Sequence, residues 1–275
     1  MRFGLSGDLR FVAVLIGLVG ATTNALWSPA DAACLRNVAE QRPIPARFGT
    51  AAVAPGHVGL TFVGHATFLI ESADGVRIAT DYNDYVRPSV IPDIVTMNNA
   101  HTTHFTDFAE PQIRYVLRGW DRTSERAEYA IQYRDVFVRN VPTNVREAGG
   151  VRVNGNSIFI FETGGLCIAH LGHLHHRLTQ EHLGQLGQID VLLVPVDGAY
   201  TLNVAQMIEV MDQIRAPLVI PMHYFTVDGL DRFLARIQAK GDGIRYATRF
   251  SDSPTIMLSR AALPDPPEIR VLPGR

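Results

Sequence analysis

The sequence predicts an α/β fold in which helices lie outside β-sheets, and two observations carry this prediction. From residue 59 to 170 the apolar residues group into short strand patterns separated by turns. From residue 179 to 258 strand patterns alternate with amphipathic helix patterns. This order is typical of sheets that bury one face in a core and carry helices on the other.

The first predicted strands are defined by the turns between them. Residues 59–63 and 67–71 flank a Gly64-His65 turn, and residues 76–80 follow Asp74-Gly75, which is a strong hairpin signal. Residues 93–97 form a short apolar run that ends in polar residues. Further strands are predicted at 112–118, 128–138, 157–161, 166–170, 191–196, 217–221, 244–248 and 254–258.

Three helices are predicted in the second half of the chain. The first covers 179–186 and opens with Thr179 as its N-cap. The others cover 203–214 and 228–237, where apolar residues recur at helical spacing. We therefore expect one domain over 58–275, preceded by a weakly patterned arm over 34–57.

Residues 1–33 are typical of an export signal. Arg2 and Arg10 precede or border an apolar stretch over 11–20, and small residues follow up to Ala33. Cleavage is expected near Ala32 and Ala33, which predicts a periplasmic or secreted protein. The alternative is an uncleaved N-terminal membrane anchor, although the apolar run is short for a span.

The two cysteines, Cys34 and Cys167, leave several alternatives open. They can pair if export brings the chain into an oxidising compartment. Cys34 directly follows small residues, as in lipoprotein sites, but Asp31 stands where such sites want an aliphatic residue. Cys167 can also be a simple buried strand residue. Membrane contact is expected only through an uncleaved signal or a lipid on Cys34.

The charge balance excludes some partners. The chain has 25 basic and 27 acidic side chains, a net charge of −2 and a pI near 6.5. No nucleic-acid partner is expected, because no strong basic field is present. The expected partner is a small-molecule substrate, and the sequence does not define an oligomeric state. Five arginines in the segment 121–157 are candidates for binding an anionic substrate: Arg122, Arg126, Arg134, Arg139 and Arg146. The alternative is that they are scattered surface charges.

Histidines cluster where three predicted strands end. The chain has ten histidines. Seven of them lie at or after the ends of the strands predicted at 93–97, 166–170 and 217–221: His101, His104, His170, His173, His175, His176 and His223. Loops at the carboxyl ends of strands are where sheet enzymes collect their active-site groups. Imidazole with few carboxylates suits Zn²⁺ better than Mg²⁺ or Ca²⁺. A single histidine of this kind is more often a hydrogen-bonded turn residue, so the prediction of a metal site depends on the three clusters together.

Several segments together resemble the metallo-β-lactamase superfamily. They are Gly64–Ile70, Ile78–Asp81 and Pro92–Thr96, followed by Ala169–Gly172 and Val219–Tyr224. The resemblance runs from about Gly59 to His223 and is nearest to the branch of ascorbate-6-phosphate lactonase and the N-acylphosphatidylethanolamine-hydrolysing phospholipase D. It implies a four-layer αββα sandwich with a metal site at one edge of the sheets.

The resemblance also implies metal ligands, and this chain departs from the family pattern. The family motif His-x-His-x-Asp-His is matched here by Asn99, His101, Thr103 and His104. The expected metal ligands are His101, His104, His170, His173 and His223, where His173 stands in place of a bridging aspartate. One or two zinc ions are predicted, and a single ion held by three or four imidazoles would leave a position open for water.

The predicted function is an exported, metal-dependent hydrolase. A metal-activated water would attack an ester, lactone, amide or phosphodiester. His65 is predicted to orient or protonate a group, with a structural histidine as the alternative. Asp107 is a candidate base or supporting carboxylate, and a helix-cap aspartate is its alternative. Because the ligand motif is altered, a non-catalytic, metal-binding or metal-sensing protein on the same fold is the rival interpretation.

Overall fold

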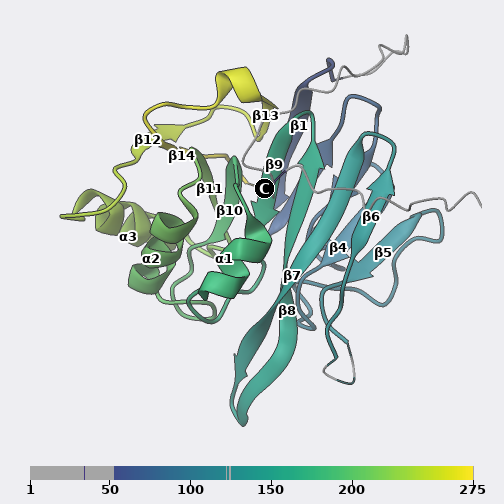
Figure 1. The fold of residues 1–275 in the computed structure, drawn as a ribbon, viewed down its shortest axis with the longest axis horizontal. Coiled ribbons are helices and arrows are strands. Elements are labelled where there is room, and N and C mark those ends of the chain that lie inside the picture. The colour runs from purple at the N-terminus through teal and green to yellow at the C-terminus, as the bar shows by residue number, and fades with distance from the viewer. Residues whose placement is uncertain (1–33, 35–52, 122, 124, 275) are drawn as a thin grey trace, which may run out of the picture. The chain divides into compact units, whose positions relative to one another are not determined.

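The computed structural model describes residue 34, residues 53–121, residue 123 and residues 125–274 (Figure 1). The predicted signal peptide over 1–33 and most of the predicted arm over 34–57 therefore lie outside the described residues. In the part of the chain that the structure describes, no helix is both long and apolar enough to cross a membrane.

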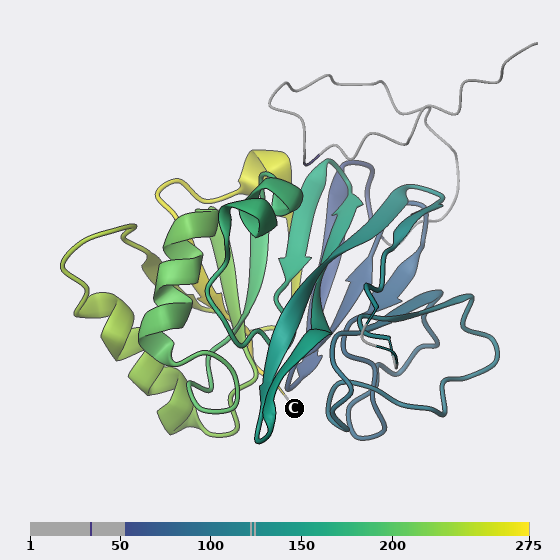
Figure 2. The same ribbon diagram turned by 60° about the horizontal axis from the view of Figure 1, so that its bottom comes forward.

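Two mixed sheets face each other (Figure 2). The first has the order β13-β1-β2-β3-β4-β5. Its strands are β1 His57–Gly64, β2 Thr67–Glu71, β3 Arg77–Ala79, β4 Ile94–Met97, β5 Tyr115–Arg118 and β13 Thr255–Ser259. The second has the order β12-β14-β11-β10-β9-β8-β7-β6. Its strands are β6 Ala130–Tyr133, β7 Val136–Glu147, β8 Gly150–Thr163, β9 Leu166–His170, β10 Val191–Pro195, β11 Leu218–Met222, β12 Ala247–Phe250 and β14 Glu268–Val271.

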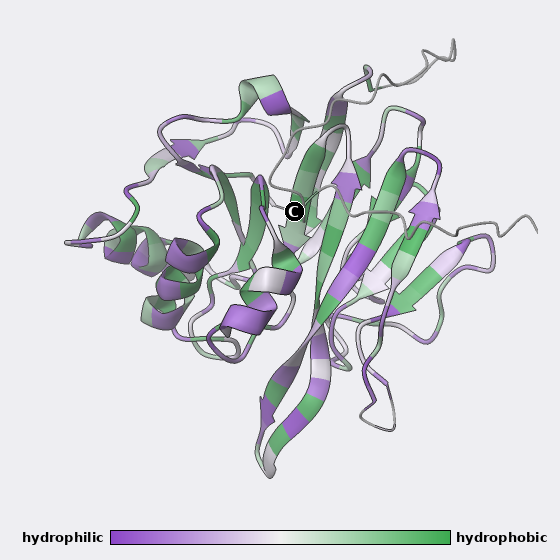
Figure 3. Ribbon diagram, in the orientation of Figure 1, coloured by the Kyte–Doolittle hydropathy of each residue, from purple (hydrophilic) through white to green (hydrophobic). Residues whose placement is uncertain are grey.

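The main core fills the space between the sheets. Phe68, Ile78 and Ile94 of the first sheet and Phe159 and Ile220 of the second belong to one buried cluster. These strands are apolar on successive residues because both of their faces are covered (Figure 3). At about 25 cal/mol per Å² of apolar surface removed from water, this burial is the principal stabilising contribution.

The helices cover the outer face of the eight-stranded sheet. These are α1 Gln180–Leu186, α2 Val204–Ile214 and α3 Val227–Gln238, and their apolar residues join a second buried cluster with strands β9 to β11. A smaller cluster around Tyr82, Val95 and Met97 lies on the six-stranded sheet, where loop residues such as Phe105 and Trp120 pack. The predicted α/β sandwich is confirmed, with loops rather than described helices at that outer face.

Most predicted elements are present with shifted ends. Thr179 caps α1 as predicted, because its hydroxyl accepts from the His182 amide. The strand predicted over 128–138 is instead two antiparallel strands, β6 and β7, which turn at Arg134 with a positive φ of 51°. The hairpin of β7 and β8 is much longer than the predicted strand at 157–161, and its far end projects beyond the sheet (Figure 1).

The two cysteines form a disulfide. Cys34 pairs with Cys167 on β9, and the carbonyl of Cys34 accepts a hydrogen bond from the Gln188 amide at 2.9 Å. The pair therefore anchors residue 34 on the outer face of the eight-stranded sheet, where both cysteines are buried. A sulfur in a disulfide cannot also carry a lipid, so the two predictions made for Cys34 exclude each other.

Candidate metal centre

Loops from both sheets bring histidines together at one edge of the sandwich. β9, β10 and β11 are parallel, so their carboxyl ends lie side by side. His223 follows β11, His104 lies in the loop after β4, and His65 occupies the turn between β1 and β2. Ring nitrogens of these three residues all lie within 4.8 Å of one another, which makes them a group able to hold a metal ion.

His104 is fixed by a buried carboxylate. Asp81 follows β3, and its Oδ2 lies 2.6 Å from Nδ1 of His104, while its Oδ1 accepts from the Asn98 amide at 2.9 Å. Both side chains are fully buried. An ionised carboxylate can only accept, so Nδ1 carries the proton and Nε2 of His104 presents a lone pair.

His223 is fixed in the same way by Asp197. Oδ1 of Asp197 lies 3.0 Å from Nδ1 of His223. Burial opposes ionisation of Asp197, but hydrogen bonds from His223 and Thr201 outweigh it and hold the pKa of this carboxyl well below its usual range. The amides of Ala199, Tyr200 and Thr201 also donate to Asp197. Such carboxylate–histidine pairs are the usual support of a metal-bound imidazole.

The resulting geometry fits a cation. Nε2 of His104 and Nε2 of His223 face each other at 3.1 Å, and each is the acceptor nitrogen of its ring. Burial and the neighbouring His223 lower the pKa of His104 well below its usual value, so a shared proton is disfavoured. Two facing lone pairs repel unless a cation lies between them. Zinc about 2.0–2.1 Å from each nitrogen in a tetrahedral site would keep them about 3.4 Å apart.

His65 completes this group. Both of its ring nitrogens are buried without a hydrogen bond to any described residue. Burial, followed by the charges of His223 and His104, lowers the pKa of His65 to about 3. A buried polar group without a partner is rare and needs an explanation, and a metal ion would provide it for one of the two nitrogens.

The backbone at the site is strained. His65, Asp81 and His223 have φ values of 53°, 43° and 56°, in the left-handed region that residues other than glycine rarely adopt. The carbonyl of His65 accepts from the His223 amide at 2.7 Å, which ties the two turns together. Strain of this kind concentrates at functional sites, where the surrounding fold enforces it.

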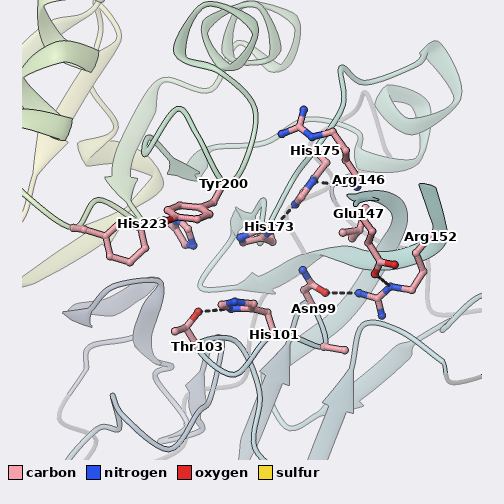
Figure 4. Close-up of a pocket in the computed structure, with 13 residues that line it drawn as sticks. Asn99, His101, Thr103, Arg146, Glu147, Arg152, His173, His175, Tyr200 and His223 are labelled. Carbon is pink, nitrogen blue, oxygen red and sulfur yellow. Dashed lines mark hydrogen bonds and ion pairs between the residues drawn. The ribbon is translucent and has the colours of Figure 1, made fainter. Parts of the chain in front are cut away.

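A pocket of about 700 Å³ opens beside the three histidines (Figure 4). His101, His173 and His223 contribute to its wall, and Tyr200 lies beside His223. The ring of Phe225, which also lines the pocket, contacts those of Tyr200 and His223. Burial and the neighbouring His104 lower the pKa of His173 far below its usual value, so this ring is neutral. Its Nδ1 lies 2.5 Å from Nε2 of His175. Nδ1 of His101 lies 2.9 Å from the Thr103 hydroxyl.

Four of the five predicted ligands come together here. The rings of His101, His104, His173 and His223 are within 6 Å of one another in successive pairs. His170 lies apart from the group: its Nε2 is 2.8 Å from the Ala66 carbonyl, and its Nδ1 accepts from the Gly172 amide at 3.1 Å. With both nitrogens engaged, His170 braces the β1–β2 turn beneath the site.

Of the two residues predicted to be catalytic, only His65 lies in the site. Asp107 is exposed and forms an ion pair with Arg118 at 3.0 Å. It does not line the pocket. The surface position of Asp107 therefore gives no support to its predicted role as a base.

The most important residue missed by the sequence reasoning is Asp197. It lies two residues after the end of β10, and β10 lies between β9 and β11, the two strands that end in histidine loops. That position was the available signal, because the carboxyl end of a central parallel strand points to the same edge as its neighbours. Asp81, which follows a predicted strand, gives the same signal, with a solvated loop carboxylate as its alternative; the structure places it against His104.

Comparisons with known proteins agree with this fold. A UPF0173 metal-dependent hydrolase of Salinibacter ruber is 23% identical over 219 residues, which cover 69% of this chain and 95% of that protein. One of Pyrococcus furiosus is 28% identical over 192 residues, or 62% of this chain and 85% of that protein. A crystal structure from Thermotoga maritima is 29% identical, with a TM-score of 0.58, and covers 79% of this chain and 100% of the other. That protein is described as a candidate Zn-dependent hydrolase of the metallo-β-lactamase superfamily.

The family model gives the family directly. The model of the beta-lactamase superfamily domain matches residues 59–223, which span the first strand of the sandwich, the histidine loops and His223. This match covers more than half of the chain, and it includes every residue of the candidate metal centre. The chain therefore belongs to the β-lactamase superfamily domain family.

Proposed function

We propose that this protein is a metal-dependent hydrolase whose metal is held by His104 and His223, with His65 as the third ligand. The observation that carries the proposal is the pair of acceptor nitrogens facing each other at 3.1 Å. The relatives named metal-dependent hydrolases support it. Zinc is the metal that an all-imidazole site suits best, although an imidazole set also accepts other transition metals.

The bound metal would polarise the bond to be cleaved and lower the pKa of its water. The chain's own residues would prepare the site for that chemistry. Asp81 and Asp197 keep His104 and His223 in one tautomer and one orientation. His101 presents its remaining nitrogen, Nε2, from the pocket wall, where it is available to a second ion or to the substrate. Nδ1 of His173 accepts from His175, so the neutral His173 ring presents Nε2–H as a donor to the substrate.

The substrate bond and the compartment are part of the same proposal. An ester, lactone, amide or phosphodiester is the bond class for a metal-activated water. Export to the periplasm or the medium is supported by the N-terminal pattern and by the Cys34–Cys167 disulfide, since disulfides persist in oxidising compartments. The branch that includes ascorbate-6-phosphate lactonase stays a prediction.

One observation favours the rival, a metal-binding protein without catalysis. Among the described residues, the carboxylates beside the imidazoles face the Nδ1 atoms of His104 and His223 and not the open pocket. The acidic residue that lines the pocket, Glu147, is paired with Arg152 at 2.7 Å. A hydrolase of this design must therefore rely on the metal-bound water without a nearby free carboxylate base.

The test is metal content together with hydrolysis. Purified protein should contain close to one equivalent of metal, and ester, lactone, amide and phosphodiester probes should show an activity that chelation abolishes and zinc restores. His104→Gln and His223→Gln should lose the metal. His57→Gln should keep it, because the His57 ring contacts the Pro55 carbonyl at 3.2 Å and does not belong to the group of three. Metal without any hydrolysis would establish the non-catalytic rival, and absence of both would refute the proposal.

A further inference from the structure

The β7–β8 hairpin places two arginines on the pocket wall, and only one of them is neutralised. Arg152 forms an ion pair with Glu147 at 2.7 Å and donates to the side-chain oxygen of Asn99 at 2.8 Å (Figure 4). Among the described residues, the guanidinium of Arg146 donates to one acceptor, the Thr201 carbonyl, at 3.3 Å. In the described ranges of the chain no carboxylate pairs with Arg146.

Arg146 is held at a fixed point of the wall. Its backbone amide donates to Nδ1 of His175 at 3.1 Å, and the other ring nitrogen of His175 contacts His173. Arg146 and Val151 are also direct partners in the register of the hairpin. The side chain therefore starts from a rigid strand, and Arg146 lines the same pocket as His173 and His223.

The other basic residues of the segment 121–157 are engaged elsewhere. Arg139 is buried in an ion pair with Glu162. Arg126 pairs with Glu128, and Arg134 donates to the Asp74 carbonyl. Among the described basic residues of that segment, the unpaired charge on the pocket wall is therefore that of Arg146.

Another part of the pocket wall is aromatic. The rings of Tyr200 and Phe225 meet edge to face at 5.7 Å, and the two residues are 65% and 60% exposed. Phe225 also contacts the rings of His65 and His223. Exposed aromatic side chains at a pocket mouth are suited to binding an apolar group of a ligand.

We propose that Arg146 selects anionic substrates: a small molecule with an apolar body against Tyr200 and Phe225 and a carboxylate or phosphate on Arg146. This deepens the proposed function and rests on it for the statement that the ligand is a substrate. Arginine suits the role, because its planar fork of donors matches carboxylate and phosphate oxygens. The charge of Arg152 does not add to the site, because Glu147 cancels it.

The proposal predicts opposite effects for two neighbouring variants. Benzoate and phenyl phosphate serve as anionic probes, and benzamide as the neutral control, in titrations of the full chain with and without zinc. Arg146→Gln should weaken binding of the preferred anion about tenfold and leave benzamide unchanged. Glu147→Gln should strengthen anion binding about two- to threefold, because it frees the charge of Arg152. Arg134→Gln, distant from the pocket, should have no effect.

The two anions and the two metal states separate the possible outcomes. Whichever of benzoate and phenyl phosphate depends more strongly on Arg146 identifies the carboxylate or the phosphate class. Anion binding that depends on Arg146 in chelated protein, without any hydrolysis after zinc addition, would refute the proposed function but keep the anion site. Absence of anion binding, equal losses for benzoate and benzamide in Arg146→Gln, or weaker binding in Glu147→Gln would overturn the anion site itself.

Discussion

Nε2 of His104 and Nε2 of His223 lie 3.1 Å apart, although the two residues are 119 positions apart in the chain. Each ring is the outer member of a carboxylate–imidazole pair, one built on Asp81 and the other on Asp197. The pairs come from different sheets, since Asp81 follows β3 and Asp197 follows β10. The two sheets must therefore be packed together before the metal centre exists, which couples metal binding to folding.

Replacing Asp197 by Asn should weaken metal binding without removing a ligand. The amide has no charge to stabilise a metal-bound imidazole, and it can let the His223 ring take the other tautomer. Loss of such a supporting carboxylate typically costs about 10- to 100-fold in metal affinity. Competition with a chromogenic chelator measures the dissociation constant for zinc.

The matched control is Asp107→Asn. Asp107 is the exposed carboxylate first predicted to act at the site, and its partner is Arg118. This variant should bind zinc as the unaltered protein does. If Asp197→Asn and Asp107→Asn lost the same zinc affinity, the net charge of the protein, and not the orientation of His223, would control that affinity.

The metal-free protein should become less stable as the pH falls from about 7 to 4.5. The pKa of His65 is lowered to about 3, chiefly by burial, so the folded protein keeps this ring neutral while the unfolded chain protonates it below about 6.5. His175, with its pKa lowered to about 4 by burial and Arg146, acts in the same direction. Stability is therefore greatest above about 6.5 and declines on acidification.

Asp81 acts in the opposite direction, because burial raises its pKa to about 6 and the folded state then takes up a proton more readily than the unfolded chain. The two histidines outweigh it, and we expect a net loss on the order of 2 kcal/mol at pH 4.5, measured by urea unfolding of chelated protein. His65→Asn should lose less over the same range. A pH dependence that His65→Asn leaves unchanged would show that other groups cause it.

The order of strands and helices was predictable because each element carries a local pattern. The apolar runs at 93–97, 191–196 and 217–221 correspond to β4, β10 and β11, and Thr179 is the N-cap of α1. The far end of the β7–β8 hairpin was not predictable in the same way. Its alternating residues face a pocket and solvent rather than a core, so the pattern does not differ from that of a polar loop.

For the site, strand ends predicted which loops meet but not which atoms face each other. His101, His104, His173 and His223 came together as expected from that rule. His170 did not join them because its ring nitrogens turn to backbone groups of the β1–β2 turn and of its own loop. Asp197 is positioned to orient His223 because three backbone amides of the following loop donate to its carboxylate. No short sequence motif predicts that loop geometry.

Removing the Cys34–Cys167 disulfide should destabilise the protein by about 2–5 kcal/mol, because the crosslink joins residues 133 positions apart and restricts the unfolded chain. Cys34→Ser, Cys167→Ser and the double variant should have the same midpoint of urea unfolding, since each removes the same bond. If Cys167→Ser were destabilising and Cys34→Ser neutral, the loss would come from packing of the buried strand β9 rather than from the crosslink.

Gly172→Ala should damage the site more than the fold, and a second glycine provides the comparison. Gly172 has a φ of +59°, and a Cβ there would lie 2.3 Å from Nδ2 of Asn98 and 2.7 Å from Oδ1 of Asn156. Those two amides contact the His170 ring and the His173 amide. Gly165 has a similar φ of +73°, but a Cβ at that position meets nothing within 4 Å.

Both substitutions carry the cost of a left-handed backbone, about 1–2 kcal/mol, and only Gly172→Ala adds the steric displacement of the two asparagines. Gly165→Ala should therefore lose about 1 kcal/mol of stability and bind zinc normally. Gly172→Ala should lose more stability and also bind zinc more weakly, because it displaces Asn98, whose backbone amide donates to the Asp81 carboxylate that orients His104. Equal stability and equal zinc affinity in the two variants would show that the asparagines yield to the new methyl group and do not position the loop.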